Sequence, residues 1–253
     1  MNIEELKEIW LAEEACAHIN GWDFSHLNGR YTEETDIPWN YETIVRSHLK
    51  REHALLDIDT GGGEFLLSLG HPYQNTAALE GYPPNVKLCS EKLLPLGIDF
   101  REMRQYGKMP FENESFDIII NRHGAYDVGE LYRVLKPNGI FITEQVGREN
   151  DRELVEMLLP NYTELPFPNA SLGIQAKLFR ESGFKIIRSE EAFRPIKFFD
   201  VGALIWFARI IEWEFPGFSV ESCFENLLKA QKILDDRGSV EGTIHRYFII
   251  AQK

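Results

Sequence analysis

Leu55-Leu-Asp-Ile-Asp-Thr-Gly-Gly-Gly-Glu-Phe, residues 55–65, is the stretch of sequence that decides the fold. An apolar run of the strand type leads into three consecutive glycines and then into a short helical stretch, Glu64 to Leu69. Glycines permit tight turns and let a ligand approach the backbone, and the first turn of a helix offers free N–H groups. The stretch therefore predicts a strand, a ligand-binding turn and a helix in succession.

The spacing of the glycines argues against a nicotinamide dinucleotide as the ligand. A dinucleotide fingerprint requires G-x-G-x-x-G, in which the last glycine lets the helix pack closely on the strand. Counted from Gly61 and Gly63, that last position is Leu66. The loop also lacks the Lys-Ser/Thr pair of a phosphate-binding loop. Another ligand is therefore expected.

Strand-like and helical stretches alternate along the rest of the chain. The predicted strands are His53 to Ile58, Thr76 to Glu80, Ile98 to Met103, Phe116 to Asn121, Ile140 to Gln145, Phe184 to Ser189 and His245 to Ala251. The helical candidates are Glu64 to Leu69, Pro83 to Leu94, Gly129 to Leu135, Arg152 to Leu159 and Leu172 to Ser182. Several of the strands lack polar alternation, which is typical of strands covered on both faces. This order predicts an α/β fold with a mostly parallel sheet and helices on both faces.

Two flanking segments concentrate aromatic residues. Residues 1–50 are expected to form an N-terminal helical cap, and residues 51–253 one catalytic domain with an aromatic helical insert at about 196–237. Trp206 and Trp213 lie seven positions apart within the insert and would share a helical face. Such a stretch is core, a surface for a homodimer, or the roof of a pocket for an apolar small molecule.

Composition excludes several classes of partner. The 253 residues carry a net charge of −13, and neither Lys nor Arg gathers into a run, so nucleic acid and anionic membranes are unfavourable partners. Cys16, Cys89 and Cys223 form no CxxC pair, so no metal site is expected. The longest apolar stretch, Val201 to Ile211, contains Arg209 and is too short to span a bilayer. We expect a soluble, cytoplasmic protein.

The glycine loop and its surroundings resemble the class I S-adenosylmethionine-dependent methyltransferases. In that family an acidic residue ends the first strand and G-x-G-x-G follows; here Asp57 takes the acidic place. Asp59, Gly61 and Gly63 take the three glycine places, so an aspartate replaces the first glycine. Aspartate tolerates unusual backbone angles. Its carboxylate either blocks the methionine portion of the cofactor or pairs with the cofactor's positive charge.

Further segments match the same family. Glu80 ends the second strand, 23 residues after Asp57 (80 − 57), where an acid accepting from both ribose hydroxyls is expected. Gln105 and Tyr106 precede Met109-Pro-Phe, resembling the family's segment beside the adenine. The resemblance covers about residues 53–146. It implies a Rossmann-like, doubly wound, mostly parallel seven-stranded sheet with an antiparallel last strand, and S-adenosylmethionine as cofactor. The implied cofactor-binding residues are Asp57, Asp59, Gly61, Gly63, Glu80, Gln105, Tyr106 and Asn121.

The loop after the fourth predicted strand is the best place to look for catalysis. Ligands of open parallel sheets bind outside the carboxyl ends of the strands, and this loop lies there. His123 could deprotonate a hydroxyl, amine or thiol, and Asp127 could assist it. Alternatively both residues fix the loop and cap the next helix. Methyl transfer depends mainly on alignment, so no diagnostic triad is required.

The acceptor is the least determined part of the prediction. A small-molecule acceptor is the leading hypothesis. An RNA or protein methyltransferase is an alternative, although the acidic balance argues against RNA. A third alternative is a non-catalytic regulatory protein that binds S-adenosylmethionine, which Asp59 in the glycine loop makes worth testing.

Overall fold

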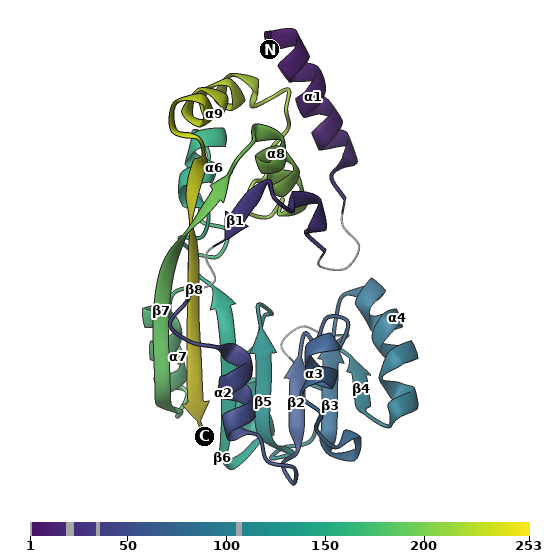
Figure 1. Cartoon of the computed structure of the whole chain (residues 1–253). Helices are drawn as coiled ribbons and strands as arrows, with labels where there is room; N and C mark the ends of the chain where they lie inside the picture. The colour runs from purple at the N-terminus through teal and green to yellow at the C-terminus, as the bar shows by residue number, and fades with distance from the viewer. Residues whose placement is uncertain (1, 19–22, 34–35, 105–107) are drawn as a thin grey trace. The chain divides into compact units, whose positions relative to one another are not determined.

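A computed structural model describes residues 2–18, 23–33, 36–104 and 108–253, and these fall into two compact units. The first unit comprises Met1–Ile37, Arg148–Pro168 and Ala192–His245, and the second comprises Pro38–Gly147, Asn169–Glu191 and Arg246–Lys253 (Figure 1). The N-terminal stretch 1–50 therefore contributes to both units. Each unit has its own hydrophobic core and is described separately.

The second unit is built on the sheet. Its strands are β2 (Leu55–Ile58), β3 (Thr76–Glu80), β4 (Asp99–Glu102), β5 (Phe116–Arg122), β6 (Leu135–Val146) and parts of β7 (Lys185–Phe198) and β8 (Val240–Gln252). The strand order is β1-β7-β8-β6-β5-β2-β3-β4. The pairs from β4 to β6 are parallel and β8 is antiparallel to β6. Figure 1 accordingly shows the arrowheads of β2, β5 and β6 at one edge. The predicted fold class is confirmed.

An eighth strand departs from the predicted seven. β1 (Tyr31–Glu33) pairs antiparallel with Ile196–Phe198 of β7, within the first unit. The sequence placed residues 31–33 in a helical cap. Three residues carry too little periodicity to mark a strand, and this one forms through a partner far along the chain.

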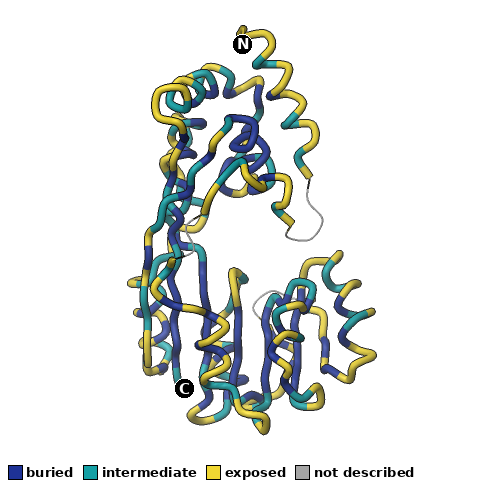
Figure 2. The backbone as a smooth tube through the Cα atoms, in the orientation of Figure 1, coloured by how far each residue is buried: buried dark blue, intermediate teal, exposed yellow. Residues whose placement is uncertain are grey.

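The described part of the second unit contains α-helices whose starting points are explained by local sequence. They are α2 (Tyr41–His48), α3 (Glu64–Ser68), α4 (Pro83–Lys92), α5 (Val128–Val134) and α7 (Leu172–Glu181). The Asn40 side chain accepts a hydrogen bond from the Thr43 N–H and caps α2. Pro83 and Pro84 occupy the first turn of α4, where a missing N–H costs nothing. Apolar side chains such as Phe141 and Phe179 stack in the core, and β2 and most of β5 are dark blue in Figure 2.

The described residues of the first unit form helices and loops, together with β1 and the ends of β7 and β8. It contains α1 (Ile3–Cys16), α6 (Arg152–Leu158), α8 (Val201–Ile210) and α9 (Phe224–Arg237). Every residue of α8 from Val201 to Ala208 is buried, and Trp206 is 2% exposed. The aromatic stretch therefore forms the core of this unit, which was one of its three interpretations. No helix in the described part of the chain has the length and apolar character needed to cross a bilayer.

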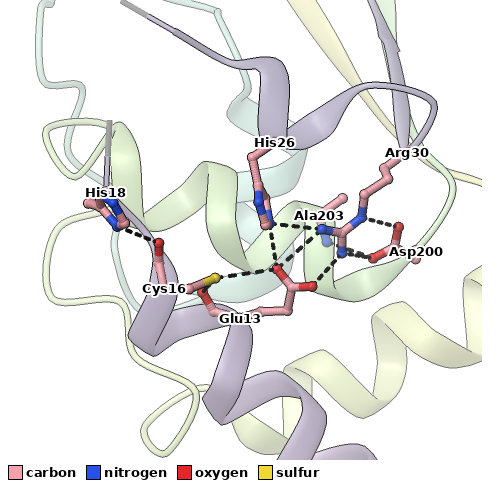
Figure 3. Close-up of polar contacts among 7 residues, drawn as sticks. All are labelled: Glu13, Cys16, His18, His26, Arg30, Asp200 and Ala203. Carbon is pink, nitrogen blue, oxygen red and sulfur yellow. Dashed lines mark hydrogen bonds and ion pairs between the residues drawn. The ribbon is translucent and has the colours of Figure 1, made fainter. Parts of the chain in front are cut away.

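A polar network centred on Arg30 ties α1 to the start of α8 (Figure 3). Arg30 donates to Glu13 Oε1 at 2.8 Å and, through Nε and a terminal nitrogen, to both carboxylate oxygens of Asp200 at 3.0 and 2.6 Å. Asp200 also accepts the Ala203 N–H and so caps α8. Burial acts to raise the pKa of Glu13, but hydrogen bonds from Arg30 and His26 outweigh it and lower that pKa. The network stabilises the first unit.

The same network contains the atoms of a potential metal site. Ligand atoms of Glu13, Cys16 and His26 lie within 4.8 Å of one another, the one such group among the described residues. Arg30 already donates to Glu13, and a terminal nitrogen of its guanidinium lies 2.9 Å from His26 Nε2. Its positive charge opposes a cation there, so we assign the cluster to packing of α1.

Candidate active site

The glycine loop follows β2 as a turn held in left-handed backbone conformations. Asp59, Gly61 and Gly63 have φ angles of 54°, 63° and 76°. This region favours glycine, and aspartate is one of the side chains that adopt it most readily. The turn therefore keeps its conformation although Asp59 occupies the family's first glycine position. The Lys92 ammonium donates to the carbonyl of Gly62 at 2.9 Å and holds the loop against α4.

Glu80 lies at the end of β3, against this loop. Its side chain is buried, and its Oε2 accepts the Gly61 N–H at 2.8 Å. Its Oε1 accepts the N–H groups of Gly81 and Tyr82, each at 2.8 Å. β2 and β3 are parallel neighbours, which brings the loop and this carboxylate to one sheet edge. The acid predicted for the ribose is thus fixed beside the predicted cofactor loop.

Two further carboxyl groups converge on the same edge. Burial raises the pKa of Asp57 to about 7, against a hydrogen bond from Thr60 at 2.7 Å, and the charges of Asp59 and Glu80 add to the rise. Burial and the charge of Glu80 raise the pKa of Asp59 to about 6, against the Ala125 N–H at 3.1 Å. A nearby positive charge would relieve this repulsion. These three carboxyl groups therefore fit a cationic ligand that also carries hydroxyl groups.

Asn121, predicted to bind the cofactor, is completely buried at the end of β5. Its Nδ2 donates to the carbonyl of Ile58 at 2.9 Å, and its Oδ1 accepts from Gln145 at 2.6 Å and from Thr143 at 3.2 Å. The Tyr41 hydroxyl donates to its backbone carbonyl at 3.0 Å. These contacts join β5 to β2 and β6 and fix the edge on which the site lies. Its role toward the cofactor stays a prediction.

The predicted catalytic His123 follows β5 with a φ of 58°. Its backbone N–H donates to the Glu144 backbone carbonyl at 2.9 Å, and its ring Nε2 lies 3.7 Å from Glu144 Oε1. Desolvation of the ring, with the guanidinium groups of Arg246 and Arg122, lowers the pKa of His123 below its ordinary value. The imidazole is therefore neutral at pH 7 and can accept a proton, but only as a weak base.

The remaining predicted site residues are Asp127, Gln105 and Tyr106. Asp127 accepts the Glu130 N–H at 2.8 Å and caps α5, the alternative that the sequence had left open. Its catalytic role stays a prediction. Gln105 and Tyr106 lie outside the described residues.

Sequence reasoning missed two residues of this edge, Glu144 and Gly124. Glu144, 3% exposed, lies within β6 and accepts the Trp39 indole N–H at 2.6 Å and the Arg122 Nε–H at 2.9 Å. Nothing local marks Glu144 as buried, because its partners come from distant segments. Gly124 is the second: a Cβ there would lie 2.6 Å from Asp59 Cβ and 2.6 Å from its Oδ2. A glycine directly after His123 in a polar loop was the available signal.

We expect Gly124→Ala to destabilise the protein by about 1 kcal/mol and to weaken cofactor binding, because the new methyl group displaces Asp59 from Ala125. Denaturant unfolding with and without S-adenosylhomocysteine measures both effects. Gly173→Ala in α7 is the matched control, since a Cβ there meets no atom within 4 Å. Equal stability of the two variants would contradict the close approach.

Comparisons with known proteins agree with this geometry. A family model described as a methyltransferase domain matches residues 56–143, from within β2 to within β6. The chain is 23% identical over 194 residues to EEF1A lysine methyltransferase 2 of Danio rerio, covering 68% of this chain and 73% of that protein. It is 25% identical over 128 residues to demethylmenaquinone methyltransferase of Lactiplantibacillus plantarum, covering 46% of this chain and 54%, about half, of that protein.

The fold is also found among solved structures. The YcgJ protein of Bacillus subtilis has a TM-score of 0.55 at 19% identity, covering 83% of this chain and 96% of that one. The matched domain contains the acid-terminated strand, the glycine turn and Glu80 described above. Residues 56–143 form a methyltransferase domain of the class I type, whose methyl donor is S-adenosylmethionine.

Proposed function

We propose that this chain transfers the methyl group of S-adenosylmethionine to a small-molecule acceptor at the carboxyl ends of β2, β3 and β5. The observation that carries the proposal is the convergence of Asp57, Asp59 and Glu80 on the glycine turn. In this proposal Glu80 holds the ribose hydroxyls, and the turn from Asp59 to Gly63 lies against the methionine portion. The buried Asp57 supports the turn through Thr60.

The chain's own residues would contribute mainly alignment. S-adenosylmethionine supplies an activated methyl group, which passes to the acceptor as its bond to sulfur breaks. Alignment of the reactants corresponds to effective molarities on the order of 10⁵–10⁸ M. His123 is neutral at pH 7 and would accept a proton from an acceptor that loses one, while Asp127 holds the start of α5. A weak base is enough where the acceptor is already nucleophilic.

The acceptor class is supported by charge and by one relative. A net charge of −13 disfavours RNA. The relative from Lactiplantibacillus plantarum is named for methylation of demethylmenaquinone, a small molecule. Protein methylation is the second candidate, since the lysine methyltransferase match covers 68% of this chain.

Two measurements test the proposal in order. Calorimetry with S-adenosylmethionine and S-adenosylhomocysteine comes first, and no heat at millimolar ligand would reject the cofactor site. Transfer of a radiolabelled methyl group is then measured into the small-molecule, protein and RNA fractions of a cell extract. Label in the small-molecule fraction supports the proposal, whereas label confined to protein selects the second candidate. Cofactor binding without transfer into any fraction would indicate a non-catalytic binding protein.

A further inference from the structure

Arg122 is a half-exposed cationic side chain at the candidate active site. It ends β5, directly before His123, and its side chain is 52% exposed. Its Nε donates to Glu144 at 2.9 Å, and its guanidinium carbon lies 5.7 Å from the centre of the Tyr41 ring. Within the described residues, neither terminal nitrogen of this guanidinium has a hydrogen-bond acceptor. One guanidinium nitrogen, Nε, is therefore bonded to Glu144, and the two terminal nitrogens remain available to a ligand.

The acid that accepts the hydrogen bond from Arg122 Nε is buried. Glu144 is 3% exposed, and its second oxygen accepts the Trp39 indole N–H at 2.6 Å. A buried carboxylate needs compensating partners, so the Arg122–Glu144 pair resists separation. With Nε occupied, the guanidinium presents its two terminal nitrogens side by side. That edge matches the two oxygens of a planar carboxylate.

The surrounding charges favour an anion at this place. The Arg246 and Arg122 guanidinium groups both lower the pKa of His123, and Glu144 is the buried acid paired with Arg122 at the end of β5. Asp57, Asp59 and Glu80 lie at the ends of β2 and β3, where they favour cationic groups. The three carboxyl groups therefore favour the cationic methyl donor, whereas the exposed part of the Arg122 guanidinium favours an anionic group.

We propose that Arg122 binds a carboxylate group of the methyl acceptor, with Glu144 and Trp39 fixing its orientation. The inference rests on the proposed function, because it places the acceptor beside S-adenosylmethionine, and it narrows the acceptor to small molecules that carry a carboxylate. A simple structural role, in which Arg122 only neutralises Glu144, predicts no preference for such ligands.

The test uses the full chain saturated with S-adenosylhomocysteine and labelled with ¹⁵N-arginine. Acetate, octanoate, benzoate and phenylacetate are titrated beside their amides, and the arginine side-chain resonances are followed. Arg122→Lys keeps the charge that compensates Glu144 but removes the fork. Arg188→Lys is the matched control, because Arg188 is 46% exposed, pairs with Glu190 and lies 5.0 Å from the Phe248 ring.

We expect carboxylates to bind in preference to their amides and to shift the Arg122 resonance. Arg122→Lys should weaken that binding by about tenfold or more, the loss of charge-assisted hydrogen bonds, and Arg188→Lys should leave it unchanged. The inference is overturned if no carboxylate binds the loaded protein, or if both variants bind as the wild type does. Binding of S-adenosylhomocysteine is measured in the same samples, and its absence would reject the proposed function itself.

Discussion

Replacement of Glu80 by alanine is expected to weaken S-adenosylmethionine binding by about a hundredfold. The carboxylate holds the N–H groups of Gly61, Gly81 and Tyr82, all at 2.8 Å, and in the proposed complex it also receives the ribose hydroxyls. Hydrogen bonds to a charged group contribute about 1.5–3 kcal/mol each, and donors left buried without an acceptor carry a further penalty. The loss of loop order and ribose contacts together gives the expected factor.

Calorimetric titration measures this effect, and a neighbouring acid provides the control. Glu102 stands opposite Glu80 in the register of β3 and β4, but its side chain is 44% exposed and pairs with Arg104. Glu102→Ala should bind the cofactor as the wild type does. Circular dichroism confirms folding of both variants. Retained affinity in a folded Glu80→Ala variant would show that the acid is a structural strand end and does not bind ribose.

The preference for S-adenosylmethionine over S-adenosylhomocysteine is expected to rise about tenfold between pH 5.5 and pH 8. The pKa of Asp59 is about 6 and that of Asp57 about 7 in the free protein. Both carboxyls lose their protons across this range, and a carboxylate attracts the sulfonium of the substrate more than the neutral sulfur of the product. The ratio of the two dissociation constants, measured by calorimetry at several pH values, gives the result.

Two variants at position 59 separate the effect of the Asp59 charge on donor binding from the effect of its side-chain size. Asp59→Asn keeps a side chain that tolerates the left-handed φ of 54° but cannot ionise, so the rise in preference should shrink. Asp59→Gly should weaken S-adenosylmethionine binding if the carboxylate pairs with the sulfonium, and tighten it if the carboxylate blocks the methionine portion. A profile unchanged in Asp59→Asn would remove Asp59 from donor selection.

The same raised pKa values affect the stability of the free protein. Because the folded-state pKa values of both acids exceed their unfolded values of about 3.9, the folded protein binds more protons than the unfolded chain between about pH 4 and pH 7. Their contribution to stability is therefore fully present below pH 4 and is lost as the pH rises toward 7. A cationic ligand restores it, so its stabilising effect is greatest on the alkaline side.

The central strands and the glycine loop could be predicted because their determinants are local. Leu55–Ile58 is a buried apolar run, and the acid, glycine and Glu80 spacing lies within one segment of the chain. The capping role of Asp127 could also be predicted, since an aspartate three residues before Glu130 is a helix-capping signal. The aromatic insert was left with several interpretations, because apolar periodicity identifies a face but not what covers it.

The remaining parts of the site depend on contacts between distant segments. Glu144 is an acid inside a strand, and only its partners Trp39 and Arg122 explain its burial. Sequence alone placed Trp39 and Tyr41 in an N-terminal cap, whereas the structure places them in the unit that holds the sheet. β1 exists only through its pairing with β7. Such partners carry no local signal.

The close approach of Asp59 and Gly124 makes two positions in different loops depend on each other. A side chain at position 124 needs the space that the Asp59 carboxylate fills, and Asp59 reaches the Ala125 N–H only because position 124 has no side chain. A glycine at position 59 would free that space and leave the Ala125 N–H without its acceptor. The effects of substitutions at 59 and 124 on stability and binding are therefore non-additive. Redesign of the loop after β5 has to vary both positions in the same library.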